Sequence, residues 1–306
     1  MAIYDCFTFF NEIELLEWRL KLLNDVVDYF VIVESNITFQ HKEKPFNLLT
    51  NYDKLEKYKK KIRYIKVNDY KNDDKNNDEL DWSVEIYQRN AILRGLYDCK
   101  DDDIIFISDI DEFINPEIIR LLKKGICQYN IVSNINERRG RRALISQLKN
   151  YLLNPSILFN RYITKDILEK TAFVCEQDLY YFFVNYKSNK KWCGTTITLF
   201  KNLKKPQDLR LKRRVLPAIK NGGWHFSYLG GINRIKEKVN STVDGVKNEM
   251  AGTVSKEKEN KINNLVNNGI VYWTGEKMNI LDINDINIKD IKWFIDKYPE
   301  MINFNK

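Results

Sequence analysis

The sequence predicts an α/β fold in which a mainly parallel sheet is flanked by helices. Short apolar runs alternate with helical patterns from residue 2 to residue 108, an order typical of layered α/β proteins. One run, residues 104–107, is apolar throughout, as expected of a strand buried on both faces. With 306 residues and 43% hydrophobic content, the chain can bury a substantial core, as one large domain or as one domain with a smaller appendage.

The elements follow one another regularly along the first third of the chain. Strands are expected at residues 2–10, 28–35, 61–67 and 103–108. Asn11, with Glu14 three residues later, can form a capping box for a helix after the first strand. Ser83 can cap a second helix that precedes the fourth strand.

Two aspartates follow the fourth strand directly. Asp109 and Asp111 project to the same side of an extended backbone, at the edge where open parallel sheets bind their ligands. Carboxylates suit Mg²⁺ or Mn²⁺, and such an ion usually completes its shell with phosphate oxygens. Asp-x-Asp is also a common tripeptide of surface turns, but its position after a buried strand favours a metal site that receives a nucleotide diphosphate.

One of only two histidines lies between two glycine pairs. His225 stands in NGGWHFSYLGG, where the paired glycines permit close backbone approach, as phosphate-binding and tight active-site loops require. Imidazole joins carboxylate in mixed Mn²⁺ sites, so His225 is a candidate metal ligand. The alternative is a core histidine with one satisfied hydrogen bond.

The net charge indicates which partners the protein can have, and the cysteines indicate its compartment. The formal net charge of +8 suits a phosphorylated ligand or an anionic membrane, and a solvated basic surface explains it equally well. No nucleic-acid partner is expected, because no helix-turn-helix, zinc-finger or RNP-type motif is found. Five widely spaced cysteines without a C-x-x-C pair fit a reducing compartment.

We expect a cytoplasmic protein that touches a membrane at most peripherally. Acidic residues come too early at the N-terminus for a signal peptide, and no apolar run is long enough to cross a bilayer. Four arginines precede an apolar-periodic stretch that could form a basic amphipathic helix: Arg138, Arg139, Arg141 and Arg142. A solvated helix face is the alternative.

Six stretches together resemble the motif series of glycosyltransferase family 17. They are YDCFTFFNEIELLEWRL, DYFVIVES followed by TF, YQRNAIL, DDIIFISDIDE, KWCGT and NGGWHFSYLGG, within residues 1–46, 81–116 and 180–239. The resemblance implies a GT-A-like nucleotide-diphospho-sugar transferase that uses a UDP-sugar, with GlcNAc favoured, and inverts the anomeric centre. It also implies Mn²⁺ or Mg²⁺ and a saccharide or glycan acceptor, of which a lipid-linked saccharide is one form.

The resemblance divides the chain into parts of one catalytic domain spanning residues 1–306. Residues 1–116 form the nucleotide-sugar half with Asp-x-Asp, and residues 179–240 form a metal and acceptor segment. Residues 117–178 carry no family motif, so an insertion or an acceptor-side region is expected there. Residues 241–306 are expected to be a helical C-terminal region.

The expected mechanism assigns residues to the donor. Asp111 and His225 are expected as direct metal ligands, with Asp111 the catalytic aspartate, and Asp109 as a ligand through water or a contact of the ribose. The residues expected to hold the nucleotide are Phe9, Asn11, Glu12, Glu34, Arg89 and Asn90. Arg89 could instead form a surface ion pair, and Glu34 could merely end its strand. Arg210, Arg213 and Arg214 can neutralise the diphosphate, or they form a solvated basic face.

An inverting transfer also needs a carboxylate to deprotonate the acceptor. Glu176, Asp178 and Asp244 are the candidates, and the sequence does not choose among them. Trp192 could stack on a sugar or belong to the core. Two other functions stay open: a metal-dependent phosphohydrolase, whose aspartyl motif would need Thr or Val where Phe113 stands, and a non-catalytic glycan-binding protein.

Overall fold

Nine strands form one sheet within the described residues of this computed structural model, which are 1–71, 80–131 and 141–304. The strands are β1 (Ile3–Phe9), β2 (Tyr29–Ser35), β3 (Ile62–Val67), β4 (Ile104–Asp109), β5 (Glu112–Ile114), β6 (Phe173–Tyr181), β7 (Tyr186–Leu199), β8 (Ala218–Ser227) and β9 (Asn279–Ile280). Their order is β3-β2-β1-β4-β7-β6-β8-β5, and β9 pairs with β7. The four strands predicted from the sequence are confirmed as β1 to β4.

The sheet is mixed, so the prediction of a mainly parallel sheet is wrong. β1 runs parallel to β2 and β4, and β2 runs parallel to β3. β7 then runs antiparallel to β4 and β6, while β5 runs antiparallel to β8. Only residues 182–185 join β6 to β7, and this connection is too short for the crossover that a parallel pair needs.

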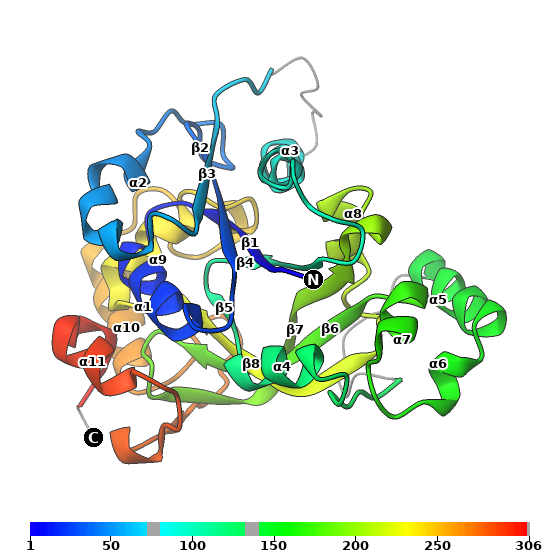
Figure 1. Cartoon of the computed structure of the whole chain (residues 1–306). Coiled ribbons are helices and arrows are strands. Elements are labelled where there is room, and N and C mark those ends of the chain that lie inside the picture. The colour runs from blue at the N-terminus through cyan, green and yellow to red at the C-terminus, as the bar shows by residue number, and fades with distance from the viewer. Residues whose placement is uncertain (72–79, 132–140, 305–306) are drawn as a thin grey trace.

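Eleven α-helices of the described chain surround the sheet. They are α1 (Ile13–Leu23), α2 (Asn47–Thr50), α3 (Ser83–Asn90), α4 (Pro116–Lys123), α5 (Arg141–Leu153), α6 (Ser156–Phe159), α7 (Lys165–Lys170), α8 (Pro206–Leu211), α9 (Gly231–Val239), α10 (Lys256–Asn267) and α11 (Ile291–Lys297). Figure 1 places α1, α9, α10 and α11 on one side of the molecule and α5, α6 and α7 in a lobe at the opposite edge. None of the described helices combines the length and the apolarity that crossing a membrane requires.

Two predicted helix caps are wrong, because neither Asn11 nor Ser83 caps its helix as predicted. The N-cap of α1 is Glu12, which makes no side-chain cap hydrogen bond, and Asn11 donates to Glu237 instead. Helix α3 begins at Ser83 itself, whose backbone N–H donates to the carboxylate of Asp81 at 2.8 Å.

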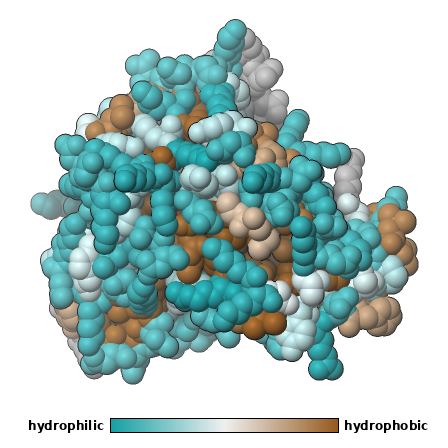
Figure 2. Space-filling model, in the orientation of Figure 1, coloured by the Kyte–Doolittle hydropathy of each residue, from teal (hydrophilic) through white to brown (hydrophobic). Residues whose placement is uncertain are grey.

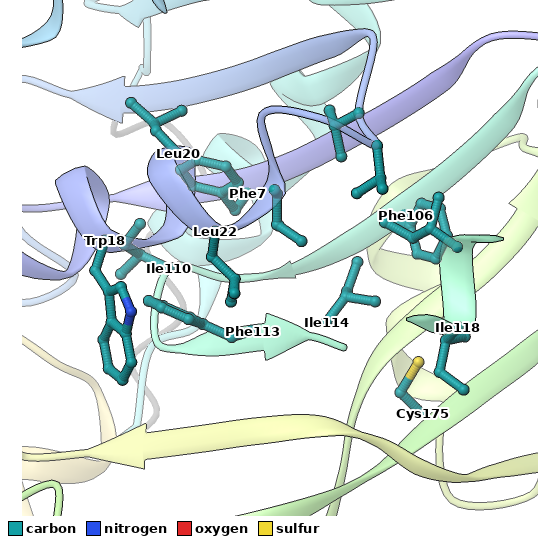
Figure 3. Packing of buried hydrophobic residues seen from close by; sticks show 14 of the residues in the cluster. Phe7, Trp18, Leu20, Leu22, Phe106, Ile110, Phe113, Ile114, Ile118 and Cys175 are labelled. Atoms are coloured by element: carbon teal, nitrogen blue, oxygen red, sulfur yellow. The ribbon is translucent and has the colours of Figure 1, made fainter. Parts of the chain in front are cut away.

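The larger core joins the sheet to helices α1 and α11 and extends to α4, α6 and α7. Trp18 of α1 stacks on Phe294 of α11 with ring centroids 4.4 Å apart and meets Phe113 edge-on at 5.1 Å. Figure 3 shows Trp18 beside Phe113 in this core. On the other face, Tyr4 and Cys6 of β1 belong to a second core. Both faces of β1 are therefore buried, which leaves the strand ends for a ligand.

Candidate functional site

A cleft with a volume of ≈ 1130 Å³ opens where β1, β4 and β8 approach α3, α8 and α9. Its wall includes the turn of Asp109, Ile110 and Asp111 that joins β4 to β5. Nine of the predicted site residues line it: Phe9, Glu12, Arg89, Asp109, Asp111, Arg210, Arg213, His225 and Asp244. Trp192 and Arg214 line it as well.

The carboxylate of Asp109 is held by two arginines. Arg89 donates to Oδ1 and Arg210 donates to Oδ2, each at 2.8 Å. Burial alone would raise the pKa of Asp109, but Arg210 and Arg89 outweigh it and hold this pKa far below its usual range. The two guanidinium groups therefore favour the ionised form of Asp109, and each of its oxygens already faces one of them.

The carboxylate of Asp111 faces a lysine and the predicted histidine. Lys238 of α9 donates to Oδ2 at 2.6 Å, and Nε2 of His225 lies 3.5 Å from Oδ1. Burial would raise the pKa of Asp111, yet Lys238 and His225 lower it below its usual range. Burial likewise opposes the charge of Lys238, but Asp111 and Glu12 raise the pKa of this ammonium.

Pairing of β5 with β8 brings His225 beside the turn, because Glu112 stands opposite His225 in the register. The pairing requires glycine at position 223, where φ is 144° and a Cβ would lie 1.9 Å from the carbonyl oxygen of Phe113. The first glycine pair therefore permits close approach between two strands, and neither of its residues is among those that line the cleft.

Glu112 belongs to the same cluster of charged side chains as Asp109 and Arg210. Its buried carboxylate accepts from Arg210, from Nε1 of Trp192 at 2.7 Å and from the N–H of Asp109 at 3.2 Å. Arg210 is therefore shared between Asp109 and Glu112, which raise its pKa although burial opposes its charge. The sequence shows Glu112 directly after Asp-x-Asp, but nothing in the sequence reveals this role.

A second residue that sequence reasoning missed is Arg19 of α1. Its guanidinium forms a two-pronged ion pair with Asp5, at 2.8 and 2.6 Å, and both side chains are fully buried. The same group donates to the carbonyl oxygens of Asp109 at 2.8 Å and Ile110 at 3.1 Å. Arg19 therefore fixes the backbone of the acidic turn from inside the core.

Arg213 is the cleft cation that its surroundings stabilise least. Burial and the nearby charge of Arg210 lower the pKa of Arg213 to about 10. Its guanidinium lies 5.4 Å from the ring centroid of Trp192. A cation disfavoured in this way gains from an incoming anion, since an opposite charge stabilises the ionised form. This site suits a phosphate group.

Aromatic rings and one carboxylate line another part of the cleft. The ring of Trp273 lies 5.6 Å from that of Tyr181 and 5.5 Å from that of Tyr228, which fixes the indole although it is 37% exposed. Tyr228 in turn lies beneath the ammonium of Lys238, 5.0 Å from its ring centroid. Burial raises the pKa of Asp244, which lines the same part and interacts electrostatically with Tyr228.

Five predicted residues are not among those that line this cleft. Buried Glu34 accepts from Lys44 at 2.8 Å and from the N–H of Leu48 at 3.1 Å, so it fastens the segment after β2. Asp178 pairs with Lys187 at 2.6 Å and with Lys191. The others are Asn11, Asn90 and Glu176.

The positions of the remaining predicted residues limit the roles that the sequence assigned to them. Asn11 lines a small hollow next to the cleft together with Glu12, and Asn90 accepts from the N–H of Gln207 at 3.1 Å. Glu176 is buried on β6. Of the three proposed bases, the structure brings only Asp244 into the cleft. The arginine cluster falls partly on residues 138 and 139, which lie outside the described residues.

The residues at the turn fit a divalent ion only in part. Oδ1 of Asp111 and Nε2 of His225 face each other across 3.5 Å, and buried Nδ1 of His225 has no hydrogen-bond partner within the described chain. Both carboxylate oxygens of Asp109 already accept hydrogen bonds from arginines. Among the described residues, no three His, Cys, Asp or Glu side chains converge on one point. Two protein ligands suffice where phosphate oxygens complete the shell.

The fold and the site define an α/β protein with a cleft that is lined by acidic and basic side chains in equal number. Comparison with known families identifies it further: the model of glycosyltransferase family 17 matches residues 1–137, which include the acidic turn. The match confirms the resemblance seen in the sequence over residues 1–137, which are somewhat less than half of the chain. A search of curated proteins gives no match.

Proposed function

We propose that this protein is an inverting glycosyltransferase that moves a sugar, with GlcNAc favoured, from a UDP-sugar to a saccharide or glycan acceptor. The observation that carries the proposal is the Asp109–Asp111 turn, which lies in the family-matched segment and opens onto a cleft large enough for a nucleotide sugar. Ligand pockets usually measure ~300–1,000 Å³, so the cleft of ≈ 1130 Å³ can hold a donor together with part of an acceptor.

The donor diphosphate is assigned to the basic wall of the cleft. Arg213 is the best candidate for direct phosphate contact, because Glu112 and Asp109 only partly offset the burial of its charge, whereas Arg89 and Arg210 each donate directly to Asp109. A guanidinium donates two parallel hydrogen bonds to phosphate and stabilises the negative charge that grows on UDP as the sugar departs. Phe9 and Glu12, at the end of β1, are assigned to the nucleoside side.

Asp111 and His225 are the residues that would hold Mn²⁺ or Mg²⁺. Such an ion, when bound, supplies Lewis-acid stabilisation to the pyrophosphate leaving group. Lys238 shares the carboxylate of Asp111, so it keeps this anion neutralised and in place before the donor arrives. Arg19 holds the turn on which Asp111 stands.

The acceptor is assigned to the side of Trp273 and Asp244. A fixed, partly exposed indole offers an apolar face against which the C–H face of a sugar can pack. Asp244 lies near Tyr228, and burial raises its pKa toward the range useful for a general base. In this arrangement Asp244 takes the proton of the attacking hydroxyl while the arginine wall retains UDP.

A donor screen with and without Mn²⁺ tests the proposal. We expect UDP and UDP-GlcNAc to raise the melting temperature in the presence of Mn²⁺, because a ligand that binds only the folded state stabilises it. UDP release with a panel of saccharide acceptors then identifies turnover. Absence of any shift with nucleotide sugars contradicts the proposal. Phosphate release from simple monoesters would indicate the phosphohydrolase, and metal-independent saccharide binding that survives Asp111→Ala would indicate a non-catalytic glycan binder.

A further inference from the structure

Helix α5 exposes its apolar residues and turns polar ones inward. Leu144, Ile145, Leu148 and Leu152 follow one another at offsets of 0, 1, 4 and 8, so they share one helix face, and all are exposed. The side of α5 that carries Gln147 and Asn150 contacts the protein: Gln147 is buried, and Asn150 donates to the carbonyl of Lys170 at 3.2 Å. A helix of a soluble domain ordinarily has the reverse orientation.

The apolar surface continues beyond the end of α5. Leu152 is 82% exposed, Leu153 80%, and Phe159 at the end of α6 82%. Leu158 and Tyr162 are exposed as well. Figure 2 shows apolar side chains at the edge of the molecule where Figure 1 places this lobe. Several large apolar side chains exposed in one lobe indicate an interaction surface rather than chance exposure. We call residues 144–162 the α5–α6 surface.

Within the α5–α6 segment itself the charge is of one sign. Residues 141–161 contain four basic residues and no Asp or Glu: Arg141, Arg142, Lys149 and Arg161. Lys149 lies on α5 among the exposed leucines, and Arg161 follows Phe159 closely; both are exposed. A surface that combines apolar side chains with basic ones is typical of helices that lie in the interface of an anionic bilayer.

We propose that the α5–α6 surface docks the protein on an anionic lipid bilayer. The exposed leucines and Phe159 enter the boundary between headgroups and acyl chains, and Lys149 and Arg161 contact lipid phosphates. A second copy of the chain is a poorer occupant, because a symmetric contact would bring the same positive charges together. The inference does not depend on the proposed glycosyl transfer.

Sedimentation of the purified full chain with vesicles tests this proposal. We expect binding to phosphatidylglycerol–phosphatidylcholine vesicles, weaker binding at high salt and little binding to phosphatidylcholine alone. Leu152→Ser with Phe159→Ser should weaken binding by about tenfold or more, because two large apolar groups no longer leave water. Phe304→Ser is the matched control, since Phe304 is 69% exposed and lies outside the lobe. Its binding should equal that of the parent.

Two results would overturn the proposal. One is vesicle binding that the double variant retains while its thermal unfolding is unchanged. The other is a protein that does not bind phosphatidylglycerol vesicles and that forms a dimer, detected by light scattering, which the same double substitution dissociates. The surface would then bind a second copy of the chain.

Lys149→Gln with Arg161→Gln should weaken binding to anionic vesicles without affecting the fold, because both side chains are exposed.

Discussion

Replacing Arg19 with methionine tests how firmly the acidic turn is held. The Arg19–Asp5 pair is fully buried, and removal of one partner from such a pair costs about 3–5 kcal/mol because the other charge stays buried and unpaired. The carbonyls of Asp109 and Ile110 also lose a donor, at about 1 kcal/mol each. We therefore expect Arg19→Met to lower the free energy of unfolding by at least about 3 kcal/mol.

Equilibrium denaturation in urea, followed by tryptophan fluorescence, measures this loss. Arg19→Met combined with Asp5→Asn should be more stable than Arg19→Met alone, because no unpaired charge remains. Lys21→Met is the matched control on the same helix: Lys21 pairs with Asp290 at 3.4 Å with both side chains partly exposed, and such pairs contribute about 0–1 kcal/mol. The reasoning would be refuted by an Arg19→Met variant that is no less stable than Lys21→Met. It would also be refuted if the losses of stability caused by Arg19→Met and by Asp5→Asn simply add in the double variant.

Three further predictions concern the cleft. Asp111→Asn should lower turnover by roughly two orders of magnitude and abolish Mn²⁺-dependent binding of UDP in calorimetry, because the main anionic ligand is lost; near-normal values would contradict its role. Arg213→Gln should raise the KM for the donor by about tenfold, whereas Lys212→Gln, one residue away and outside the cleft, should not. Since burial raises the pKa of Asp244 and a base must be deprotonated, kcat/KM for the acceptor should rise with pH through a pKa above the ordinary aspartate value. An acid limb that Asp244→Asn leaves unchanged would exclude this base.

The first four strands and the acidic turn could be predicted because their signals are local. Strand β4 is a short apolar run, and Asp109 and Asp111 stand at its end in the sequence as they do in the fold. Parallel pairing of β4 with β1 also follows from the alternating order of strands and helices. Residues that share one short segment keep their spatial relation whatever the rest of the chain does.

The partners of the acids could not be predicted, because they come from remote elements. Lys238 is 127 residues from Asp111 in the chain, and Arg19 is 90 residues from Asp109. Basic residues are common along the chain, so nothing distinguishes these two from surface lysines and arginines until the helices pack. Strand β7, which makes the sheet mixed, was not among the strands predicted from the sequence, and its short link to β6 sets its antiparallel direction.

The charges that line the cleft nearly balance, although the chain as a whole is basic. Six acidic and six basic side chains line it, against a formal net charge of +8 for the protein. The acidic residues favour the ionised forms of Arg89, Arg210 and Lys238, but they also cancel the attraction that these cations would exert on a diphosphate. A UDP-sugar therefore meets little net positive field, and a divalent ion that arrives with it would supply the missing charge. This balance supports a metal-dependent donor site at Asp111 and His225, and it leaves much of the excess positive charge on outer surfaces such as that of α5 and α6.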